Sequence, residues 1–230
     1  MISIVVPCFN EEQSVARFRE ELLPAAAALG EHELVFVDDG STDGTRAALG
    51  ALPGARVEVH ERNRGLGAAI RTGIAATRGD WVVTLDADLT FHPSQIPALV
   101  AKQRESDCDA VLGSPFLRKG DLADVPWRRR LPSILMNAFY RGAFSHRLSA
   151  YTPIFRLYRG FVLRGLDLRA DGYEINAEIL ARFLLAKKKV EEVPAALTTR
   201  AEGVSKLSSW REAKRHASLI ARLLAERRSL

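Results

Sequence analysis

The chain has 230 residues, of which 47% are hydrophobic and 27% charged, and its net charge is +5. This length and apolar content fit one large globular domain, or a domain with an appendage, and exclude wholesale disorder. The charge is unevenly spread, because residues 1–112 carry −7, residues 113–166 carry +8 and residues 200–230 carry +5. An acidic half followed by a basic half suggests a cation site in the first and an anionic or membrane-surface partner for the second.

Cysteine usage and apolar run lengths exclude several further classes. Cys8 and Cys108 are the only cysteines and lie far apart, which argues against a disulfide scaffold or zinc ribbon and fits a reducing cytosol. No basic region precedes residues 2–6, so no signal peptide is expected. The longest apolar run, residues 22–29, contains Pro24 and is far shorter than the ~20 residues of a membrane span. The protein is expected to be soluble or to lie on a surface.

Strand and helix signals alternate along the first half. Short apolar runs predict buried strands at residues 2–6, 34–37, 57–60, 81–85 and 110–112. Helices are predicted at residues 11–29 (bent near Pro24), 42–49, 67–77 and 93–105. This alternation predicts an α/β fold with a mostly parallel, Rossmann-like central sheet and helices on both faces. Ligands of such sheets bind beyond the carboxyl ends of the strands.

The rhythm changes after Gly113. Residues 114–130 are basic and rich in turn formers, and the segments that follow predict helices at 131–144, 174–186 and 208–228 and strands at 154–158 and 190–193. The last helix has apolar residues at spacings of three and four, namely Trp210, Ala213, Ala217, Ile220 and Leu224, widened by Leu219 and Leu223. Basic residues flank this stripe. The pattern predicts an amphipathic helix that lies on an anionic membrane, or that packs on its own domain or a second subunit.

Two pairs of carboxylates follow predicted strands. Asp38 and Asp39 end the second strand, and Asp86 and Asp88 follow the fourth. In an extended segment Asp86 and Asp88 point the same way, so both can bind one hard divalent cation. Such a cation clamps a diphosphate and neutralises charge on a leaving group. The plainer alternatives are solvated turn carboxylates at 86–88 and a turn with a helix cap at 38–45.

Two other nucleotide-related classes fit poorly. A dinucleotide-dependent dehydrogenase is disfavoured because Gly65 and Gly67 follow the third predicted strand, while the first leads into residues 7–10 without a glycine. The sequence also has no Walker A loop. Nucleic-acid binding is disfavoured because the basic stretches lack interleaved aromatic residues and the first half is acidic.

Four ordered segments resemble the motifs of inverting family 2 glycosyltransferases. They are residues 6–12 (VPCFNEE), 37–45 (VDDGSTDGT), 63–73 (NRGLGAAIRTG) and 86–89 (DADL). The resemblance covers residues 2–115 and is closest to dolichol- and polyprenyl-phosphate mannosyl- and glucosyltransferases. It implies a GT-A nucleotide-sugar fold with a catalytic domain at residues 1–207, divided into a donor and metal half (1–115) and an acceptor half (116–207). Residues 208–230 then form the basic amphipathic helix.

The resemblance also implies roles for individual residues. It places a nucleotide sugar, a GDP- or UDP-hexose, against Pro7, Asn10, Glu11, Asp38, Asp39, Gly65 and Asp86. It assigns Asp86 and Asp88 to Mg²⁺ or Mn²⁺ on the diphosphate, with a catalytic role for Asp88. In segments 129–133 (RRLPS) and 200–207 (RAEGVSKL), it places the catalytic cations Arg129, Arg200 and Lys206 around the phosphates.

The predicted activity is transfer of a hexose, mannose or glucose, to a polyprenyl phosphate by a peripheral protein at the cytoplasmic membrane face. A lipid phosphate is already a charged nucleophile, so alignment and leaving-group stabilisation suffice. A hydroxyl acceptor would require a base, for which Asp88 and Glu174 are candidates. Pro115 stands where the family has arginine, and residues 150–156 lack its acidic residue and glycine. A soluble acceptor, a catalytically weak sugar-nucleotide-binding protein and a homo-oligomer therefore stay open.

Overall fold

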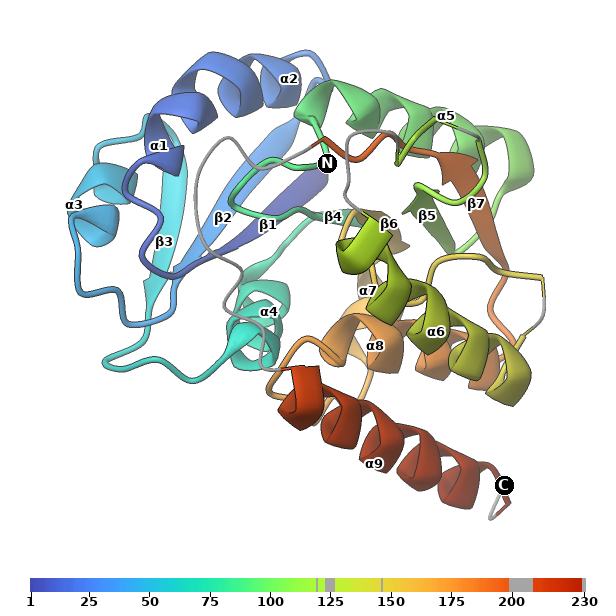
Figure 1. The fold of residues 1–230 in the computed structure, drawn as a ribbon. Helices are drawn as coiled ribbons and strands as arrows, with labels where there is room; N and C mark the ends of the chain where they lie inside the picture. Colours follow the sequence, from blue (N-terminus) through green and yellow to red (C-terminus); the bar gives the residue numbers. More distant parts are fainter. Residues whose placement is uncertain (119, 123–126, 146, 199–208, 229–230) are drawn as a thin grey trace.

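In a computed structural model, the described residues form a seven-stranded sheet with helices on both faces (Figure 1). The described residues are 1–118, 120–122, 127–145, 147–198 and 209–228, and only the backbone is described for 127–130, 132, 209–210 and 228. The strand order is β3-β2-β1-β4-β6-β5-β7. β6 runs antiparallel to β4 and β5, and the other neighbouring strands are parallel. The α/β class and the mostly parallel sheet are thereby confirmed.

The first half supplies five parallel strands and the helices that connect them. The strands are β1 (Ile2–Cys8), β2 (His32–Asp38), β3 (Ala55–Val59), β4 (Trp81–Thr84) and β5 (Ala110–Ser114). The helical elements are α1 (Ser14–Arg17), η1 (Phe18–Leu22), α2 (Leu23–Ala27), α3 (Thr45–Gly50), α4 (Leu66–Ala76), η2 (Pro93–Gln95) and α5 (Ile96–Ser106). The predicted helix at 11–29 is divided by the π-helical turn η1. Pro24 follows this turn and has no N–H to continue the regular ladder.

The second half adds two strands to the same sheet. Its elements are α6 (Trp127–Ala143), β6 (Arg156–Arg159), α7 (Gly160–Arg164), α8 (Ile175–Leu185), β7 (Val190–Pro194) and α9 (Ser209–Arg228). The short helix α7 was not predicted, because five residues are too few to show a helical period. β6 lies between β4 and β5, so the residues that follow β4 lie beside those that precede β6.

Three apolar clusters hold the layers together. In one, Ile4, Val6 and Phe36 of the sheet pack against α1, η1, α2 and α5; in a second, Val5 of the opposite face packs against α4, α7 and α8. Every residue of β1 is buried, which explains why this strand reads as a continuous apolar run. The third cluster joins α6, α8 and α9 around Tyr140 and Leu223.

One face of α9 packs on the rest of the protein, beneath α8 and α6 in Figure 1. The buried residues are His216, Leu219 and Leu223, whereas Ala217 is exposed. Of the predicted stripe, Leu219 and Leu223 are thus buried and Ala217 is not, and the inward face also includes a histidine. Within the described ranges, each helix is too short or too polar to cross a bilayer.

Candidate functional site

The candidate site lies where the order of the strands reverses. From β1 the chain passes to β2 and β3 on one side, and then to β4 on the other side of β1. The crevice outside the carboxyl ends at such a switch point is the usual ligand site of an open α/β sheet. Pro7 is buried in β1, and Asn10 follows this strand. Asp38 ends β2 and Asp39 follows it, and Asp86 follows β4. The fold thus brings three separate predicted segments to one edge.

The loops after β1 and β2 are locked together by reciprocal hydrogen bonds. The backbone N–H of Asn10 donates to Ser41 Oγ (3.0 Å), and the backbone N–H of Thr42 donates to Asn10 Oδ1 (2.8 Å). Asn10 adopts a positive φ of 54°, a conformation that asparagine tolerates better than most residues. The backbone N–H of Glu11 donates to Thr45 Oγ1 (2.8 Å). The predicted nucleotide segment is therefore a rigid double loop.

The carboxylates at the end of β2 are buried and accept hydrogen bonds from the protein. Asp38 Oδ1 accepts from the backbone N–H of Ser41 (3.1 Å). Asp39 Oδ1 is bonded to His60 Nδ1 (2.6 Å) and accepts from the backbone N–H of Arg64 (2.9 Å). Asp39 Oδ2 accepts from the backbone N–H of Gly65 (2.9 Å) and retains capacity for one more donor. Asp39 thus ties the glycine loop before α4 to the end of β2.

His60 is a site residue that the sequence analysis did not assign. Its ring bonds to Asp39 on one side and, through Nε2, to Thr72 Oγ1 of α4 (2.9 Å) on the other. The ring is buried, and His60 directly follows β3 at the same edge of the sheet as Asp39. A histidine at the end of a predicted strand, beside two acidic strand ends, was the available signal.

Two glycines let the loop before α4 approach the second half of the chain closely. Gly65 has φ +95°, and a Cβ on it would stand 2.4 Å from the carbonyl oxygen of Asp171. A Cβ on Gly67 would stand 2.2 Å from the carbonyl oxygen of Ala170, and the backbone N–H of Gly67 donates to Asp171 O (2.8 Å). Arg71 also reaches Asp171 Oδ1 (2.6 Å). Only glycine permits this contact between the two halves.

Asp86 and Asp88 form the carboxylate pair beyond β4. Asp86 Oδ2 accepts from Thr90 Oγ1 (2.5 Å), whereas Asp86 Oδ1 is buried and has no hydrogen-bond partner among the described groups. Burial, and then the neighbouring Asp88 charge, raise the pKa of Asp86 to about 7. A divalent cation would oppose both causes and would occupy the unpartnered oxygen. The carboxylate oxygens of the pair are therefore suitable ligands for Mg²⁺ or Mn²⁺.

The protein offers such a cation few other ligands. Within the described part of the chain, no group of three or more histidine, cysteine, aspartate or glutamate side chains is placed to hold a metal ion. Mg²⁺ is commonly held by one or two carboxylates together with water and substrate phosphates, so two carboxylates are enough. The ring of His92, four residues after Asp88, makes other contacts. Its Nδ1 is bonded to Ser94 Oγ (2.7 Å), and its Nε2 lies 3.2 Å from Glu21 Oε2.

The residues predicted to surround the phosphates are only partly described. Arg200 and Lys206 lie outside the described residues, and Arg129 lies in the first turn of α6 with only its backbone described. The inner face of α6 is anchored to the segment before β6, because Asn137 Oδ1 accepts from the backbone N–H of Tyr151 (2.7 Å). This is the stretch that departs from the family pattern.

Glu174, the candidate base, is buried next to the first residue of α8. Its Oε1 accepts from the backbone N–H of Gly172 (3.3 Å), and its Oε2 is buried without a partner among the described groups. The loop that contains Gly172 also contains Ala170 and Asp171, which contact Gly65 and Gly67, so Glu174 lies near the loop before α4. The arrangement leaves a carboxylate oxygen available to a polar ligand.

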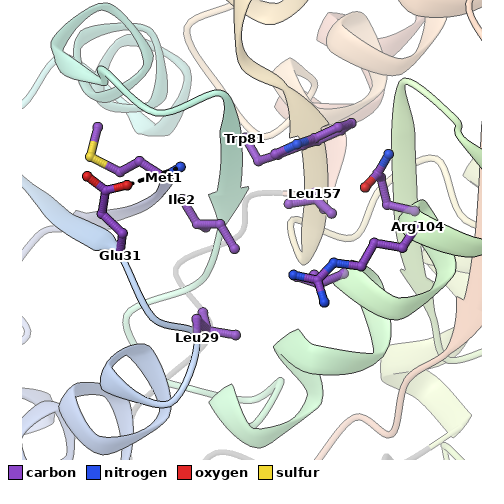
Figure 2. Close-up of a pocket in the computed structure, with 9 residues that line it drawn as sticks. Met1, Ile2, Leu29, Glu31, Trp81, Arg104 and Leu157 are labelled. Atoms are coloured by element: carbon purple, nitrogen blue, oxygen red, sulfur yellow. Dashed lines mark ion pairs between the residues drawn. The ribbon is translucent and has the colours of Figure 1, made fainter.

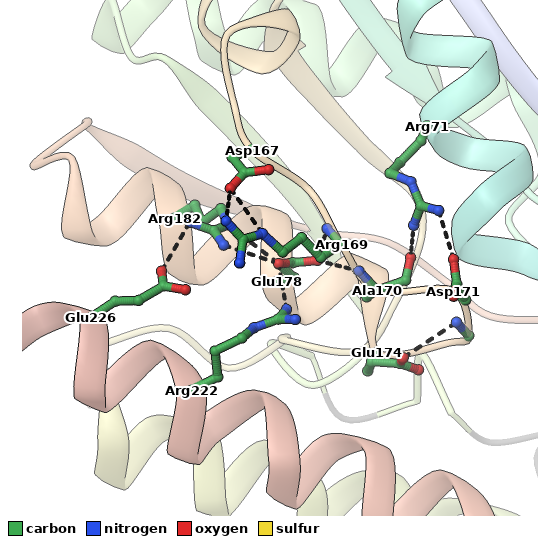
Figure 3. A network of polar contacts seen from close by, with 11 residues as sticks. Arg71, Asp167, Arg169, Ala170, Asp171, Glu174, Glu178, Arg182, Arg222 and Glu226 are labelled. Carbon is green, nitrogen blue, oxygen red and sulfur yellow. Dashed lines mark hydrogen bonds and ion pairs between the residues drawn. The ribbon is translucent and has the colours of Figure 1, made fainter.

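A second buried glutamate, Glu178, joins three parts of the acceptor half (Figure 3). Its Oε2 accepts from the backbone N–H of Ala170 (2.7 Å), in the loop that contacts Gly65 and Gly67. Its Oε1 pairs with Arg222 of α9 (2.7 Å) and with Arg182 of its own helix (3.2 Å). Arg182 in turn contacts Glu226 (3.2 Å). Glu178 therefore links the packing of α9 to the position of the Ala170 loop, which contacts Gly65 and Gly67.

A shallow pocket lies at the opposite edge of the sheet (Figure 2). It is lined by Met1 and Trp81 at the starts of β1 and β4, and by Arg104 of α5. The terminal amine of Met1 lies 3.8 Å from Glu31 Oε2. Because ligands of parallel sheets bind at the carboxyl edge, this pocket is not part of the candidate site.

Known proteins similar to this chain support a common family. The model of the family described as glycosyl transferase family 2 matches residues 3–166. An undecaprenyl-phosphate 4-deoxy-4-formamido-L-arabinose transferase from Shewanella sediminis is 37% identical over 72% of this chain and 50% of its own length. A dodecaprenyl-phosphate galacturonate synthase from Rhizobium johnstonii is 30% identical over 89% of this chain and 61% of its own length. The chain thus spans only half to three fifths of these curated relatives.

Solved structures with the same fold include glucosyl-3-phosphoglycerate synthase from Mycobacterium tuberculosis. Its complex with Mn²⁺, uridine diphosphate and glucosyl-3-phosphoglycerate is 26% identical to this chain, with a TM-score of 0.67. The match covers 99% of this chain and 79% of that one. The same enzyme has been solved with Mg²⁺ and uridine diphosphate. The structural neighbour therefore binds a nucleoside diphosphate and a divalent cation together.

Proposed function

Because the chain belongs to glycosyl transferase family 2, we propose that it transfers a sugar from a nucleotide sugar to a polyprenyl phosphate. The observation that carries the donor chemistry is the Asp86–Asp88 pair at the switch point, with one buried carboxylate oxygen lacking a partner. The relatives named for undecaprenyl and dodecaprenyl phosphate support the acceptor. These relatives are named for a modified arabinose and for galacturonate, so the predicted mannose or glucose is a narrower proposal.

In this proposal Asp86 and Asp88 hold Mg²⁺ or Mn²⁺. The cation, when bound, neutralises charge on the departing nucleoside diphosphate. The double loop of Asn10 and Ser41, with Pro7, Glu11 and Asp38, shapes the nucleotide pocket. A pyrimidine donor such as a uridine-diphosphate sugar is favoured over a guanosine one, because the structural neighbour binds uridine diphosphate.

The other candidate residues are proposed to orient the nucleotide sugar and the phosphates. Asp39 and His60 fix the loop of Gly65, whose backbone then approaches the donor closely. Arg129, Arg200 and Lys206 are proposed to hold the phosphates, since guanidinium groups bind phosphate oxygens in a bidentate fork. A lipid phosphate attacks without a general base, so orientation and charge neutralisation supply the rate. The division into a donor half (1–115), an acceptor half (116–207) and a terminal helix (208–230) is part of the proposal.

The acceptor and the nucleotide are tested together by a panel. Nucleoside diphosphate release is measured with uridine- and guanosine-diphosphate sugars, with and without a polyprenyl phosphate, in the presence of Mn²⁺. We expect release that depends on both the uridine donor and the lipid phosphate, and that stops when EDTA is added. Release that ignores the lipid phosphate contradicts the proposed acceptor, and release in EDTA contradicts the metal.

A soluble acceptor is the second candidate. It is favoured by the altered stretch at residues 150–156 and by the structural neighbour, which is named for phosphoglycerate rather than a lipid. A hydroxyl nucleophile needs a base, and the unpartnered Oε2 of Glu174 is available for that role. Transfer to 3-phosphoglycerate that is lost in Glu174→Gln, without transfer to polyprenyl phosphate, would favour this candidate. Peripheral attachment at the cytoplasmic membrane face belongs only to the lipid-acceptor proposal.

A further inference from the structure

Helix α6 exposes an apolar face that the fold does not use. Leu131, Leu135 and Phe139 recur every four residues on one side of the helix, and Ile134 lies beside them. Phe139 is 66% exposed and Leu135 is 53% exposed. These four side chains are the α6 apolar face. A contiguous exposed apolar patch on one helix face is typical of an interaction surface.

The opposite face of α6 already satisfies the packing of the helix. Tyr140 is fully buried, stacks on Tyr151 with ring centroids 5.3 Å apart, and is bonded to His216 of α9 (2.7 Å). Asn137 is also buried and accepts from the backbone of Tyr151. These inward contacts hold the helix in place. The α6 apolar face is therefore not needed to pack the helix against the described part of the molecule.

The topology places both ends of the segment that contains α6 at the edge of the candidate site. β5 runs in the same direction as β1 and β4, so it ends at the carboxyl edge of the sheet. β6 runs in the opposite direction, so it begins at that edge. Thr84, two residues before Asp86, pairs with Arg156, the first residue of β6. The segment between β5 and β6, which includes α6, therefore starts and finishes at the same edge as the carboxylate pair.

The charge of this segment indicates what the face contacts. Residues 115–155, between β5 and β6, hold 7 basic and only 2 acidic side chains, and three consecutive arginines, 128–130, directly precede Leu131. An apolar helix face embedded in strongly basic sequence matches the interfacial region of an anionic bilayer, where apolar side chains enter the acyl boundary and cations meet headgroups. A protein partner would require acidic charge of the same extent.

We propose that the α6 apolar face inserts into the surface of an anionic membrane and holds the candidate site at the bilayer. The inference rests on the proposed lipid-phosphate acceptor, which is confined to a membrane. It assigns membrane contact to α6 rather than to the inward-facing apolar residues of α9. The lipid phosphate then reaches the site from the same surface on which the helix lies.

The test uses two phenylalanines of nearly equal exposure. Phe139 is 66% exposed on α6, and Phe161 is 67% exposed on α7, which follows β6 at the opposite edge of the sheet. The full chain and the variants Phe139→Ser and Phe161→Ser are floated with phosphatidylcholine vesicles that contain or lack phosphatidylglycerol. We expect Phe139→Ser to lower the partition coefficient about tenfold on anionic vesicles, and Phe161→Ser to leave it unchanged. Wild-type binding should weaken without phosphatidylglycerol.

The possible outcomes separate the surface from the activity. Equal flotation of the two variants, or binding that ignores phosphatidylglycerol, would overturn the membrane assignment. A Phe139→Ser variant that floats normally, but sediments as a monomer where the wild type is a dimer, would instead assign the face to a second copy of the chain. Flotation needs no acceptor, so absence of transfer to polyprenyl phosphate overturns the proposed function and leaves the membrane surface standing. Equal thermal unfolding of both variants excludes a folding defect.

Discussion

The buried carboxylates that follow β2 and β4, in the first half, are held differently from Glu178 in the second half. In the donor half, Asp38 and Asp39 accept from backbone amides and a histidine, and among the described residues no lysine or arginine lies within ion-pair distance of them or of Asp86. In the acceptor half, Glu178 is held between Arg182 and Arg222. A neutralised carboxylate is a structural joint, whereas an unneutralised one still attracts a cation. At the carboxyl edge of the first half, these carboxylates are thus not neutralised by any described lysine or arginine.

The largest expected effect comes from removing that charge. Asp86→Asn should lower transfer at least ~1000-fold, because the cation loses a ligand, while the free energy of unfolding stays equal or rises by about 1 kcal/mol. The rise is expected because the substitution removes a buried, repelled carboxylate. Activity is measured as nucleoside diphosphate release with Mn²⁺, and stability by urea unfolding.

Asp80→Asn is the matched control for this variant. Asp80 lies at the other end of β4, exposed and bonded to the terminal amine of Met1 (3.1 Å). It should leave transfer unchanged. A fully active Asp86→Asn protein, or one destabilised by several kcal/mol, would show that Asp86 is a structural joint like Glu178 and would remove the contrast between the halves.

The next effect tests the joint itself. Glu178→Ala should lower the free energy of unfolding by about 4 kcal/mol, because it leaves two arginines and the backbone amides of Arg169 and Ala170 without their acceptor. Glu226→Ala, which removes a half-exposed partner of Arg182, should cost no more than about 1 kcal/mol. The free energies of unfolding of both variants are measured in urea. Similar losses of stability would contradict the conclusion that Glu178 joins α8, α9 and the Ala170 loop.

Much of the donor edge could be predicted from the sequence, because its parts are contiguous. Strands buried on both faces read as apolar runs, so their ends were visible, and Asp38, Asp39 and Asp86 could be placed at one edge. The antiparallel insertion of β6 could not be predicted, since a short apolar run carries no sign of strand direction. The bond between His60 and Asp39 was missed because it depends on the neighbouring positions of β2 and β3.

The acceptor half was harder, because its contacts join distant residues. Arg222 lies 44 residues from Glu178, and their pairing depends on how α9 docks. His216 was left out of the predicted face of α9 and Ala217 was included, because histidine counts as polar and alanine as apolar, yet His216 is the buried one. A polar residue with a buried hydrogen-bond partner defeats hydrophobic patterning.

A smaller effect asks whether the donor carboxylates also support the fold. Asp39→Ala removes the partner of His60 Nδ1 and of the backbone amides of Arg64 and Gly65, and should lower the free energy of unfolding by about 3 kcal/mol. Asp43→Ala, in the same motif, loses an exposed cap to the Thr45 backbone N–H and should cost about 1 kcal/mol. Urea unfolding of the pair checks this, and an equal cost would deny Asp39 its role as a clamp.

The smallest expected effect is the contribution of His216, at the interface between α9 and α6, to the pH dependence of stability. Burial lowers the pKa of His216 from 6.5 to about 4, so the folded protein binds a proton there less readily than the unfolded chain. The stability is therefore complete above pH 6.5 and is lost as the pH falls toward 4, by about 2 kcal/mol at pH 5. Asp86, whose pKa is raised to about 7, contributes in the opposite direction over this range, but its contribution is common to the wild type and to His216→Phe. Urea unfolding at pH 7 and pH 5 should therefore show that the wild type loses about 2 kcal/mol of stability relative to His216→Phe. An equal change in both proteins would mean that carboxylates, and not the α9 interface, set the pH dependence of the fold.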